Sequence, residues 1–198
     1  SKNHKTPAIA HRQIRRGGTV GGVCAAKVSE AEVMVHGGIA SVFITSEIVG
    51  SMKIDRLCAL ADQAEMMVAC DQPANAQDLS KAAQTRGVEL GVVIEIETGL
   101  RRCGVREIDA GVALAKEIDS LTGLRFRGVM SHQVIPEMPD REDRAVEANR
   151  TIKAVIDLKD AIEAAGIPMD IVSTGETWSY DVAADIPGVT EIQGGSYL

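Results

Sequence analysis

Five short polar segments hold most of the residues in this sequence that could do chemistry; they comprise residues 2–6, 95–104, 131–133, 173–177 and 193–197. The first supplies amines and an imidazole, the second carboxylates and guanidinium groups, and the third another imidazole. Nucleophiles, acids and bases are therefore all represented. The last two segments are rich in glycine and hydroxyl side chains, which often surround a bound phosphate. A shared function requires a fold that brings such segments together.

The two glycine-rich loops are candidates for a phosphate site. Backbone N–H groups would bind the phosphate oxygens, assisted by hydroxyl groups, and glycine would let the backbone approach closely. The residues concerned are Thr174, Gly175, Gly195, Ser196 and Tyr197. Glycine and serine are also common in ordinary turns, so the composition of the loops leaves a plain turn as the alternative.

Two carboxylates alternate on one apolar run. Glu95 and Glu97 are two residues apart, so on a strand they face the same side. Inside a packed sheet such groups need a charged or hydrogen-bonding partner. We expect Arg102 or a histidine to be that partner, with both glutamates supporting the site.

Short apolar runs typical of strands alternate with longer stretches of helical period. The expected strands are 20–25, 41–45, 66–70, 90–97, 126–131, 169–173 and 190–193. The expected helices are 7–17, 29–36, 51–63, 73–86, 106–121, 140–165 and a short one at 177–184. Ser29 and Glu32 form the pattern of a capping box, and glycines at 37, 38, 87, 123 and 166 follow helix ends.

Strands separated by helices imply parallel crossovers, in either an open doubly wound sheet or a closed barrel. An open dinucleotide fold would place a GxGxxG turn after its first strand, whereas residues 26–29 read Ala-Lys-Val-Ser. A (β/α)8 TIM barrel is therefore favoured. Seven strands, and a length below the roughly 250 residues typical of that barrel, predict a fragment that lacks the first strand.

Composition narrows the function classes. The 198 residues are 45% hydrophobic and 25% charged, which suits one packed domain. The net charge of −7 argues against nucleic acid as a partner. Apolar runs end far short of the roughly 18 to 20 residues that cross a bilayer, so no membrane association is expected. The four dispersed cysteines form no metal-ligand pair and are expected to be reduced thiols of a cytoplasmic protein.

The motifs resemble those of one enzyme family. Lys-x-His-Lys at residues 2–5, the run 23–32, Thr-Gly-x-x-Arg-Cys-Gly-Val at 98–105 and Gly-Gly-Ser-Tyr at 194–197 stand in register. Together they are similar to the D-threonine aldolase and D-serine dehydratase family, which includes D-3-hydroxyaspartate aldolases. The resemblance covers nearly the whole chain. It implies a pyridoxal-phosphate (PLP) enzyme of fold type III, with residues 1–198 as an incomplete PLP-binding barrel domain.

The resemblance also implies roles for residues near the cofactor. Lys2 matches the lysine that forms the Schiff base, a task that suits an amine whose pKa falls on desolvation. Lys5 is the competing amine, and His4 lies close by in sequence. Arg102 matches an arginine directed at the phenolate oxygen of the cofactor ring, while its neighbour Arg101 is expected to be a surface cation.

His132 departs from the family pattern. Relatives commonly have tyrosine there, and Val134 replaces a glycine that often follows. An imidazole at this position could act as acid or base, could shape selectivity, or could be structural. Residues 135–143 read as a loop beside the site and a possible lid.

The implied reaction is retro-aldol cleavage of a D-3-hydroxy amino acid to glycine and an aldehyde or glyoxylate. The alternatives are a dehydratase acting on D-serine or 3-hydroxyaspartate, and a non-catalytic PLP carrier protein. The family builds a second β domain, expected outside the given chain, that supplies a divalent metal of Mg or Mn type. No metal ligand is therefore expected within the 198 residues. The expected partners are a small D-amino acid and a second copy in a homodimer.

Overall fold

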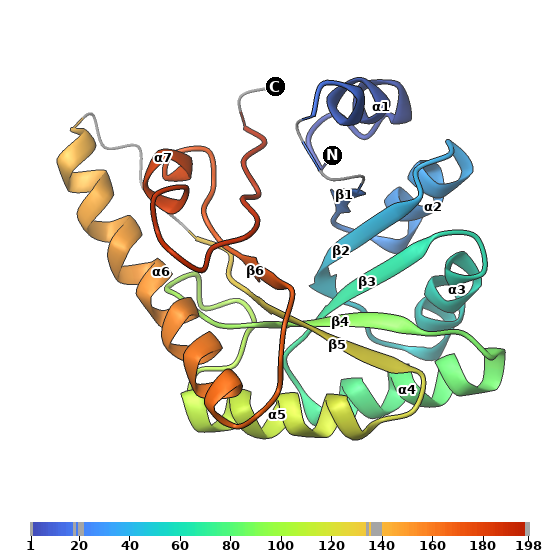
Figure 1. Cartoon of the computed structure of the whole chain (residues 1–198). Coiled ribbons are helices and arrows are strands. Elements are labelled where there is room, and N and C mark those ends of the chain that lie inside the picture. The colour runs from blue at the N-terminus through green and yellow to red at the C-terminus, as the bar shows by residue number, and fades with distance from the viewer. Residues whose placement is uncertain (1, 18, 20–21, 134, 136–139, 197–198) are drawn as a thin grey trace. The chain divides into compact units, whose positions relative to one another are not determined.

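The structure is a computed structural model (Figure 1), and it describes residues 2–17, 19, 22–133, 135 and 140–196. The chain divides into two compact units. Unit 1 takes the described residues of Ser1–Val92 and Ser120–Arg125, and unit 2 those of Val93–Asp119 and Phe126–Tyr197. Strands β4 (Leu90–Glu95) and β5 (Leu124–Met130) contribute residues to both units.

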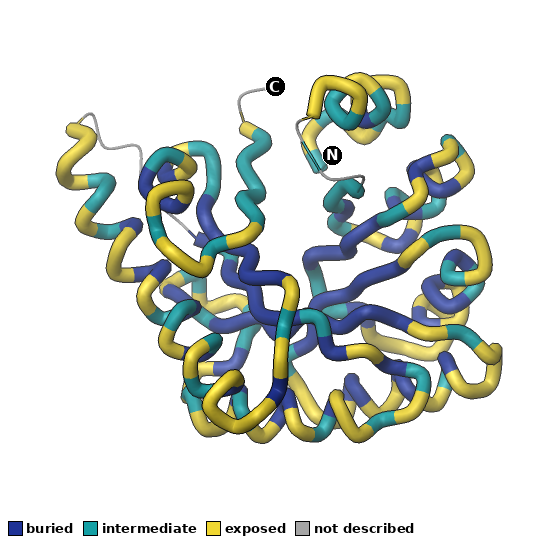
Figure 2. The backbone as a smooth tube through the Cα atoms, viewed as in Figure 1, coloured by how far each residue is buried: buried dark blue, intermediate teal, exposed yellow. Residues whose placement is uncertain are grey.

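Unit 1 alternates helices and strands along the chain. Its elements are α1 (Pro7–Arg15), β1 (Gly22–Ala25), α2 (Val28–His36), β2 (Ser41–Glu47), α3 (Ser51–Ala61), β3 (Glu65–Cys70) and α4 (Pro73–Arg86). β1 pairs with β2, and β2 with β3, both in parallel. Helices α2 and α3 pack on these strands, so the middle of β2 and most of β3 are buried, as Figure 2 shows in dark blue.

Helix α4 has clear sequence signals at both ends. Pro73 lies in the first turn, where its fixed φ suits the helix and its missing N–H would have no helical partner. Gly87 follows the helix at φ 75°, in the left-handed conformation that favours glycine. The observed range, Pro73–Arg86, is the range that the sequence predicts.

The capping box expected from Ser29 and Glu32 is wrong. Helix α2 begins at Val28, and the side chain of its N-cap, Lys27, makes no capping hydrogen bond. The Glu in the first turn, Glu30, instead accepts a hydrogen bond from the preceding backbone at 2.8 Å, while Glu32 forms an ion pair with α3. The N-cap lies two residues earlier than the capping box requires, at Lys27 instead of Ser29, so Glu30 and not Glu32 is the residue that can reach back.

Unit 2 contains the end of β4, most of β5, and α5 (Ile108–Ser120), α6 (Arg141–Ala164), β6 (Ile171–Ser173) and α7 (Tyr180–Ala183). β5 pairs with β6 in parallel, and Gly128 stands opposite Ile171. A Cβ at Gly128 would lie 1.8 Å from the Ile171 carbonyl oxygen, so only glycine allows this approach. Asp140 caps α6 by accepting N–H groups of its first turn.

The strands follow one another in chain order, β1 to β6, and six of the seven expected strands are confirmed. The strand expected at residues 190–193 is wrong, because Glu191 forms only an isolated parallel bridge with Ser173. The N–H groups of Thr190 and Glu191 both donate to the carbonyl of Val172. One carbonyl thus takes two donors, and a regular ladder does not develop.

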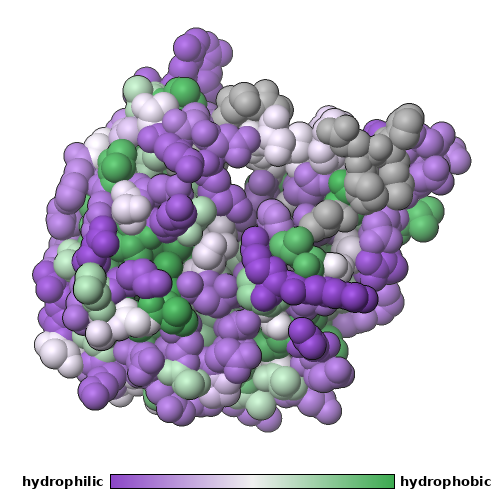
Figure 3. Space-filling model, turned by 180° about the vertical axis from the view of Figure 1, so that it is seen from behind, coloured by the Kyte–Doolittle hydropathy of each residue, from purple (hydrophilic) through white to green (hydrophobic). Residues whose placement is uncertain are grey.

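The seven expected helices are all found among the described residues; α4 has the expected ends, and the other six are shifted at one or both ends by one to three positions. Large exposed hydrophobic residues are scattered; they include Val33, Val49, Met52, Val146 and Tyr180. Figure 3 shows one face that is mostly hydrophilic, with apolar side chains in small groups. Within the described part of the chain, no helix is long and apolar enough to span a bilayer. The cysteines are free thiols, and Cys58 and Cys70 are buried.

Candidate active site

The loop after β4 is shaped by a glycine that no other residue could replace without displacement. Gly104 has φ 101°, and a Cβ there would lie 2.6 Å from the backbone nitrogen of Glu97. This close approach returns the chain beside the strand end, where Ile96 and Val105 form a parallel bridge. The Thr-Gly-x-x-Arg-Cys-Gly-Val motif therefore encodes a tight loop that carries Arg102 at a defined position.

Arg102, Glu95 and Cys103 form a polar cluster at the base of this loop. Arg102 Nη2 lies 3.4 Å from Glu95 Oε1, and Arg102 Nε donates to Cys103 Sγ at 3.2 Å. The Glu95 side chain is 3% exposed and that of Arg102 is 50% exposed. The hydrogen bond to Cys103 raises the pKa of Arg102 above its usual value, so the guanidinium stays charged. The expected pairing of Glu95 with Arg102 is confirmed.

Glu97 does not share this arginine. Its Oε1 accepts the backbone N–H of Arg101 at 2.8 Å and that of Gly99 at 2.5 Å. The bond from Arg101, followed by that from Gly99, holds the pKa of Glu97 below its usual value, against the opposing effect of burial. Glu97 therefore stabilises the turn that precedes Arg102, and the expected pairing of Glu97 with Arg102 or a histidine is replaced by backbone contacts.

The two glycine-rich loops meet within unit 2. Gly195 N–H donates to Thr177 Oγ1 at 3.1 Å, and Ser196 N–H donates to the same atom at 2.9 Å. Two consecutive backbone donors that converge on one oxygen form the kind of concavity that binds anions. Thr177 was not among the residues predicted for the site. Its signal in the sequence is a hydroxyl two residues after Gly175, in a loop already singled out.

Thr174 and Gly175 lie deeper than this amide pair. Thr174 is fully buried, and its hydroxyl lies 2.8 Å from that of Ser131. Gly175 has φ 86°, and a Cβ there would lie 2.7 Å from Cβ of Ala183. Both residues therefore set the path of the loop. Tyr197, the fifth predicted phosphate residue, is outside the described residues.

His132 is half-buried and lies two residues after the end of β5. Its carbonyl accepts a hydrogen bond from Thr98 Oγ1 at 3.5 Å, which ties the end of β5 to the loop of the Arg102 cluster. Val134 and residues 136–139 lie outside the described residues, so the predicted lid stays a prediction. Ile135 is buried, and α6 begins at Arg141.

The opening Lys-x-His-Lys motif belongs to unit 1. Lys2 is half-buried, in a turn that precedes α1. His4 accepts the N–H of Thr6 at 3.2 Å, and burial lowers the pKa of its imidazole. Lys5 forms an ion pair of 3.0 Å with Glu30. The two lysines thus differ, since Lys5 is held by a carboxylate that also binds the start of α2.

Known proteins match the chain over its whole described length. Residues 2–198 match the family described as alanine racemase, N-terminal domain. A 3-hydroxy-D-aspartate aldolase of Paracoccus denitrificans is 39% identical over 99% of the chain and 51% of its own length. A D-threonine aldolase of Arthrobacter is 33% identical over 100% of the chain and 52% of its own length.

A solved structure gives the same result for the fold. The crystal structure of D-threonine aldolase from Filomicrobium marinum superposes with a TM-score of 0.94 at 38% identity, over 99% of this chain and 53% of that one. The chain spans about half the length of these relatives. By its sequence match and its fold, the chain belongs to the alanine racemase N-terminal domain family.

Proposed function

We propose that this protein is a PLP-dependent lyase that cleaves a D-3-hydroxy amino acid, of D-threonine or 3-hydroxyaspartate type, by a retro-aldol reaction. The products are glycine and an aldehyde or glyoxylate. The observation that carries the proposal is the pair of amides, Gly195 N–H and Ser196 N–H, that converges on one oxygen in a chain similar to two aldolases. Such a pair suits the phosphate of the cofactor.

The donor set fits PLP in three respects. A phosphate oxygen could take the place of the Thr177 hydroxyl as the acceptor of both amides. A Cβ at Gly195 would meet nothing within 4 Å, so there is open space beside this backbone. Arg102 is half exposed and charged, with a buried carboxylate behind it, as a cation facing an anionic ring oxygen requires.

Each residue has a proposed task toward the cofactor. Lys2 supplies the amine that binds the cofactor aldehyde, and Arg102 keeps the ring phenolate ionised. Gly195 and Ser196 hold the phosphate through their amides, while Thr174 and Gly175 shape the loop behind them. Tyr197 stays a proposed member of the phosphate group and lies outside the described residues. PLP, when bound, supplies an electron sink next to the substrate α carbon.

His132 is the proposed proton-handling residue. It follows β5 as a half-buried imidazole and is linked through its carbonyl to the Arg102 loop. An imidazole titrates near neutral pH, so it can take the proton of the substrate 3-hydroxyl as the bond between the α and β carbons breaks. A divalent metal would lower the pKa of that hydroxyl. We assign none of the described residues as its ligand.

The remaining parts of the proposal concern the binding partners and the cellular compartment. The substrate is a small D-amino acid, and neither nucleic acid nor a membrane is part of the scheme. We propose a homodimer in the cytoplasm, on the resemblance to the family. Cross-linking or light scattering of the purified whole protein measures the oligomeric state.

Product analysis tests the reaction. The purified whole protein is incubated with D-threonine, D-serine and D-3-hydroxyaspartate, with PLP and a divalent metal present. Glycine with acetaldehyde or glyoxylate supports the aldolase. A 2-oxo acid with ammonia from the same substrates replaces it with the dehydratase. Bound PLP without turnover of any of the three substrates supports the carrier protein instead.

A further inference from the structure

A buried polar chain of contacts lies behind the candidate phosphate loop in unit 2. At its centre is Gln133, which is 3% exposed. Its Oε1 accepts the hydroxyl of Ser179 at 2.7 Å, and its Nε2 donates to the hydroxyl of Thr151 on α6. Ser179 is fully buried and Thr151 is 1% exposed. Gln133 therefore joins the loop after β5 to α6 and to the turn that precedes α7.

The other hydrogen bonds of Ser179 and Thr151 determine which group donates and which accepts in their contacts with Gln133. The N–H of Glu176 donates to Ser179 Oγ at 3.0 Å, so the Ser179 hydroxyl has its proton available for Gln133. The Thr151 hydroxyl donates to carbonyls of its own helix, at 3.0 Å for Ala148, which leaves a lone pair for the Gln133 amide. Only a side chain with one acceptor and one donor satisfies both ends.

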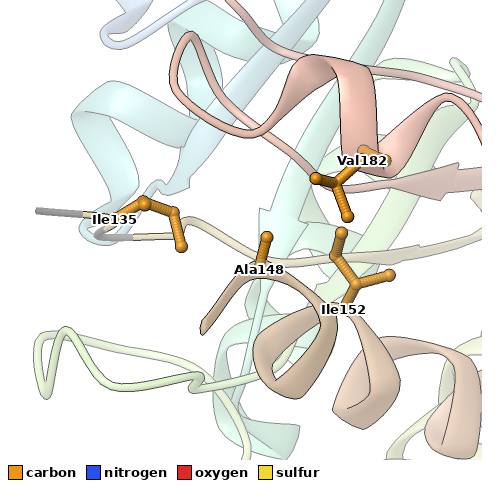
Figure 4. Packing of buried hydrophobic residues seen from close by; sticks show 5 residues of the cluster. Ile135, Ala148, Ile152 and Val182 are labelled. Carbon is orange, nitrogen blue, oxygen red and sulfur yellow. The ribbon is translucent and has the colours of Figure 1, made fainter. Parts of the chain in front are cut away.

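An apolar cluster adjoins these polar contacts through Ala148, whose carbonyl accepts the Thr151 hydroxyl. Ile135, Ala148, Ile152, Val182 and Ala183 form one buried cluster, and Figure 4 shows side chains from α6, α7 and the segment after β5 within it. If one partner in these contacts were removed, the polar group opposite it would stay buried without a hydrogen bond. That group would then carry its full desolvation cost. The turn at residues 176–179 therefore depends on Gln133 for its position.

This turn carries the hydroxyl oxygen that accepts the two backbone N–H groups proposed to bind the phosphate. Thr177 lies between Glu176 and Ser179, and its Oγ1 accepts the N–H groups of Gly195 and Ser196. We propose that Gln133 is a positioning residue: it holds this turn, and Thr177 Oγ1 of the turn keeps the two amides convergent for the phosphate oxygen that takes its place. This inference rests on the proposed function, because the phosphate is that of PLP.

Comparison of PLP with pyridoxal, which lacks the phosphate, tests the inference. Binding to the whole protein is measured by absorbance titration for wild type and Gln133→Met, a change that keeps the side-chain length but removes the hydrogen bonds. The Kd for PLP should rise about tenfold, the scale of one lost buried hydrogen bond, while that for pyridoxal should change less than about twofold. Equal losses for both ligands would overturn the positioning role.

A second variant guards against misfolding of the first. Ser179→Ala removes only one oxygen from the same chain of contacts, and it should give the same selective loss for PLP. Ser80→Ala is the matched control in unit 1, since Ser80 is also buried and donates to the Thr122 carbonyl at 2.7 Å. It should lower the melting temperature and leave both Kd values unchanged.

The outcomes separate the two proposals. If the wild-type protein binds neither PLP nor pyridoxal, the proposed function fails. If it binds both, and Ser179→Ala leaves the ratio of the two Kd values at the wild-type level, the cofactor part of the proposed function stands and the role of Gln133 is refuted. A raised ratio in Ser179→Ala but not in Ser80→Ala supports both the cofactor and the role of Gln133.

Discussion

Units 1 and 2 use the same alternation of strand and helix in different ways. In unit 1 the pattern repeats at a spacing of 24 residues: Ser41 contacts Glu65, Glu32 contacts Arg56, and Asp62 contacts Arg86. The connections from strand to helix are short there. In unit 2, segments of irregular chain separate β4 from α5 and β6 from α7.

The two units also differ in how many polar side chains they bury. Among the described residues of unit 1 they are Thr45, Asn75 and Ser80, whereas those of unit 2 are Glu95, Thr98, Ser131, Gln133, Thr151, Ser173, Thr174 and Ser179. Burying polar side chains costs free energy unless each is hydrogen-bonded. A regular repeat is stable without many buried polar side chains, and their larger number among the described residues of unit 2 supports the site proposed there.

The largest effect is expected at His132. His132→Ala should lower kcat/KM by about 100-fold, the usual scale for a positioned acid or base, and should leave the cofactor absorbance intact. His132→Tyr should keep cofactor binding and shift the preference among 3-hydroxy amino acids. His11→Ala is the control in unit 1, where the imidazole lies 2.7 Å from the Gly37 carbonyl and only stability should suffer. Unchanged kcat/KM in His132→Ala would remove this residue from the site.

A pair of glycine variants compares the units directly. Gly50 and Gly104 both have positive φ, and an alanine at either position is strained by about 1 to 3 kcal/mol. A Cβ at Gly50 meets nothing within 4 Å, whereas one at Gly104 meets the backbone of Glu97 at 2.6 Å. This clash should add about 1 to 3 kcal/mol to the loss of unfolding free energy and weaken PLP binding. Equal losses of stability, with equal PLP affinity, would contradict the role given to the Gly104 loop.

Glu97 should make the stability of unit 2 depend on acid pH. Its pKa is lower in the folded protein than the usual value of 4.5, so its ionised form adds stability above the unfolded-state pKa. That stability is lost as the pH falls through the folded-state pKa. Glu97→Gln should therefore have a flatter stability profile below pH 4.5 in chemical denaturation. Parallel profiles of wild type and variant would show that the backbone contacts of Glu97 contribute nothing.

The smallest effect is expected for the ion pairs of the repeat. Arg86 and Asp62 are each 44% exposed, at a closest approach of 2.6 Å. Arg86→Met should reduce the unfolding free energy by less than about 1 kcal/mol, since solvent screens such pairs, and should leave PLP binding unchanged. Weakened cofactor binding in this variant would contradict the purely structural role given to this ion pair.

The sequence predicts an element well where residues that favour the start or the end of a helix stand at both of its ends. Helix α4 begins at Pro73 and is followed by Gly87, and the sequence predicts both of its ends from these residues. Residues 190–193 alternate as a strand would, yet only Glu191 reaches a bridge. Period-two patterning does not report how many ladder bonds form, because that depends on the neighbouring strand.

The contacts of the candidate site also divide into short-range ones that the sequence predicts and long-range ones that it does not. The Glu95 and Arg102 pair could be predicted because the two residues lie seven positions apart on one strand and its loop. Thr177 and Gln133 were missed as site residues, since their contacts join positions 18 and 46 residues apart. Such contacts follow from the packing of α6 on α7 and on β6, which no short motif encodes.

The central proposal is that Lys2 is the lysine that binds the aldehyde of PLP. Borohydride reduction of the whole protein loaded with PLP, followed by peptide mapping, tests it most directly. The account predicts a phosphopyridoxyl group on Lys2 and none in Lys2→Ala. A label on Lys5, or on any lysine other than Lys2, would contradict it.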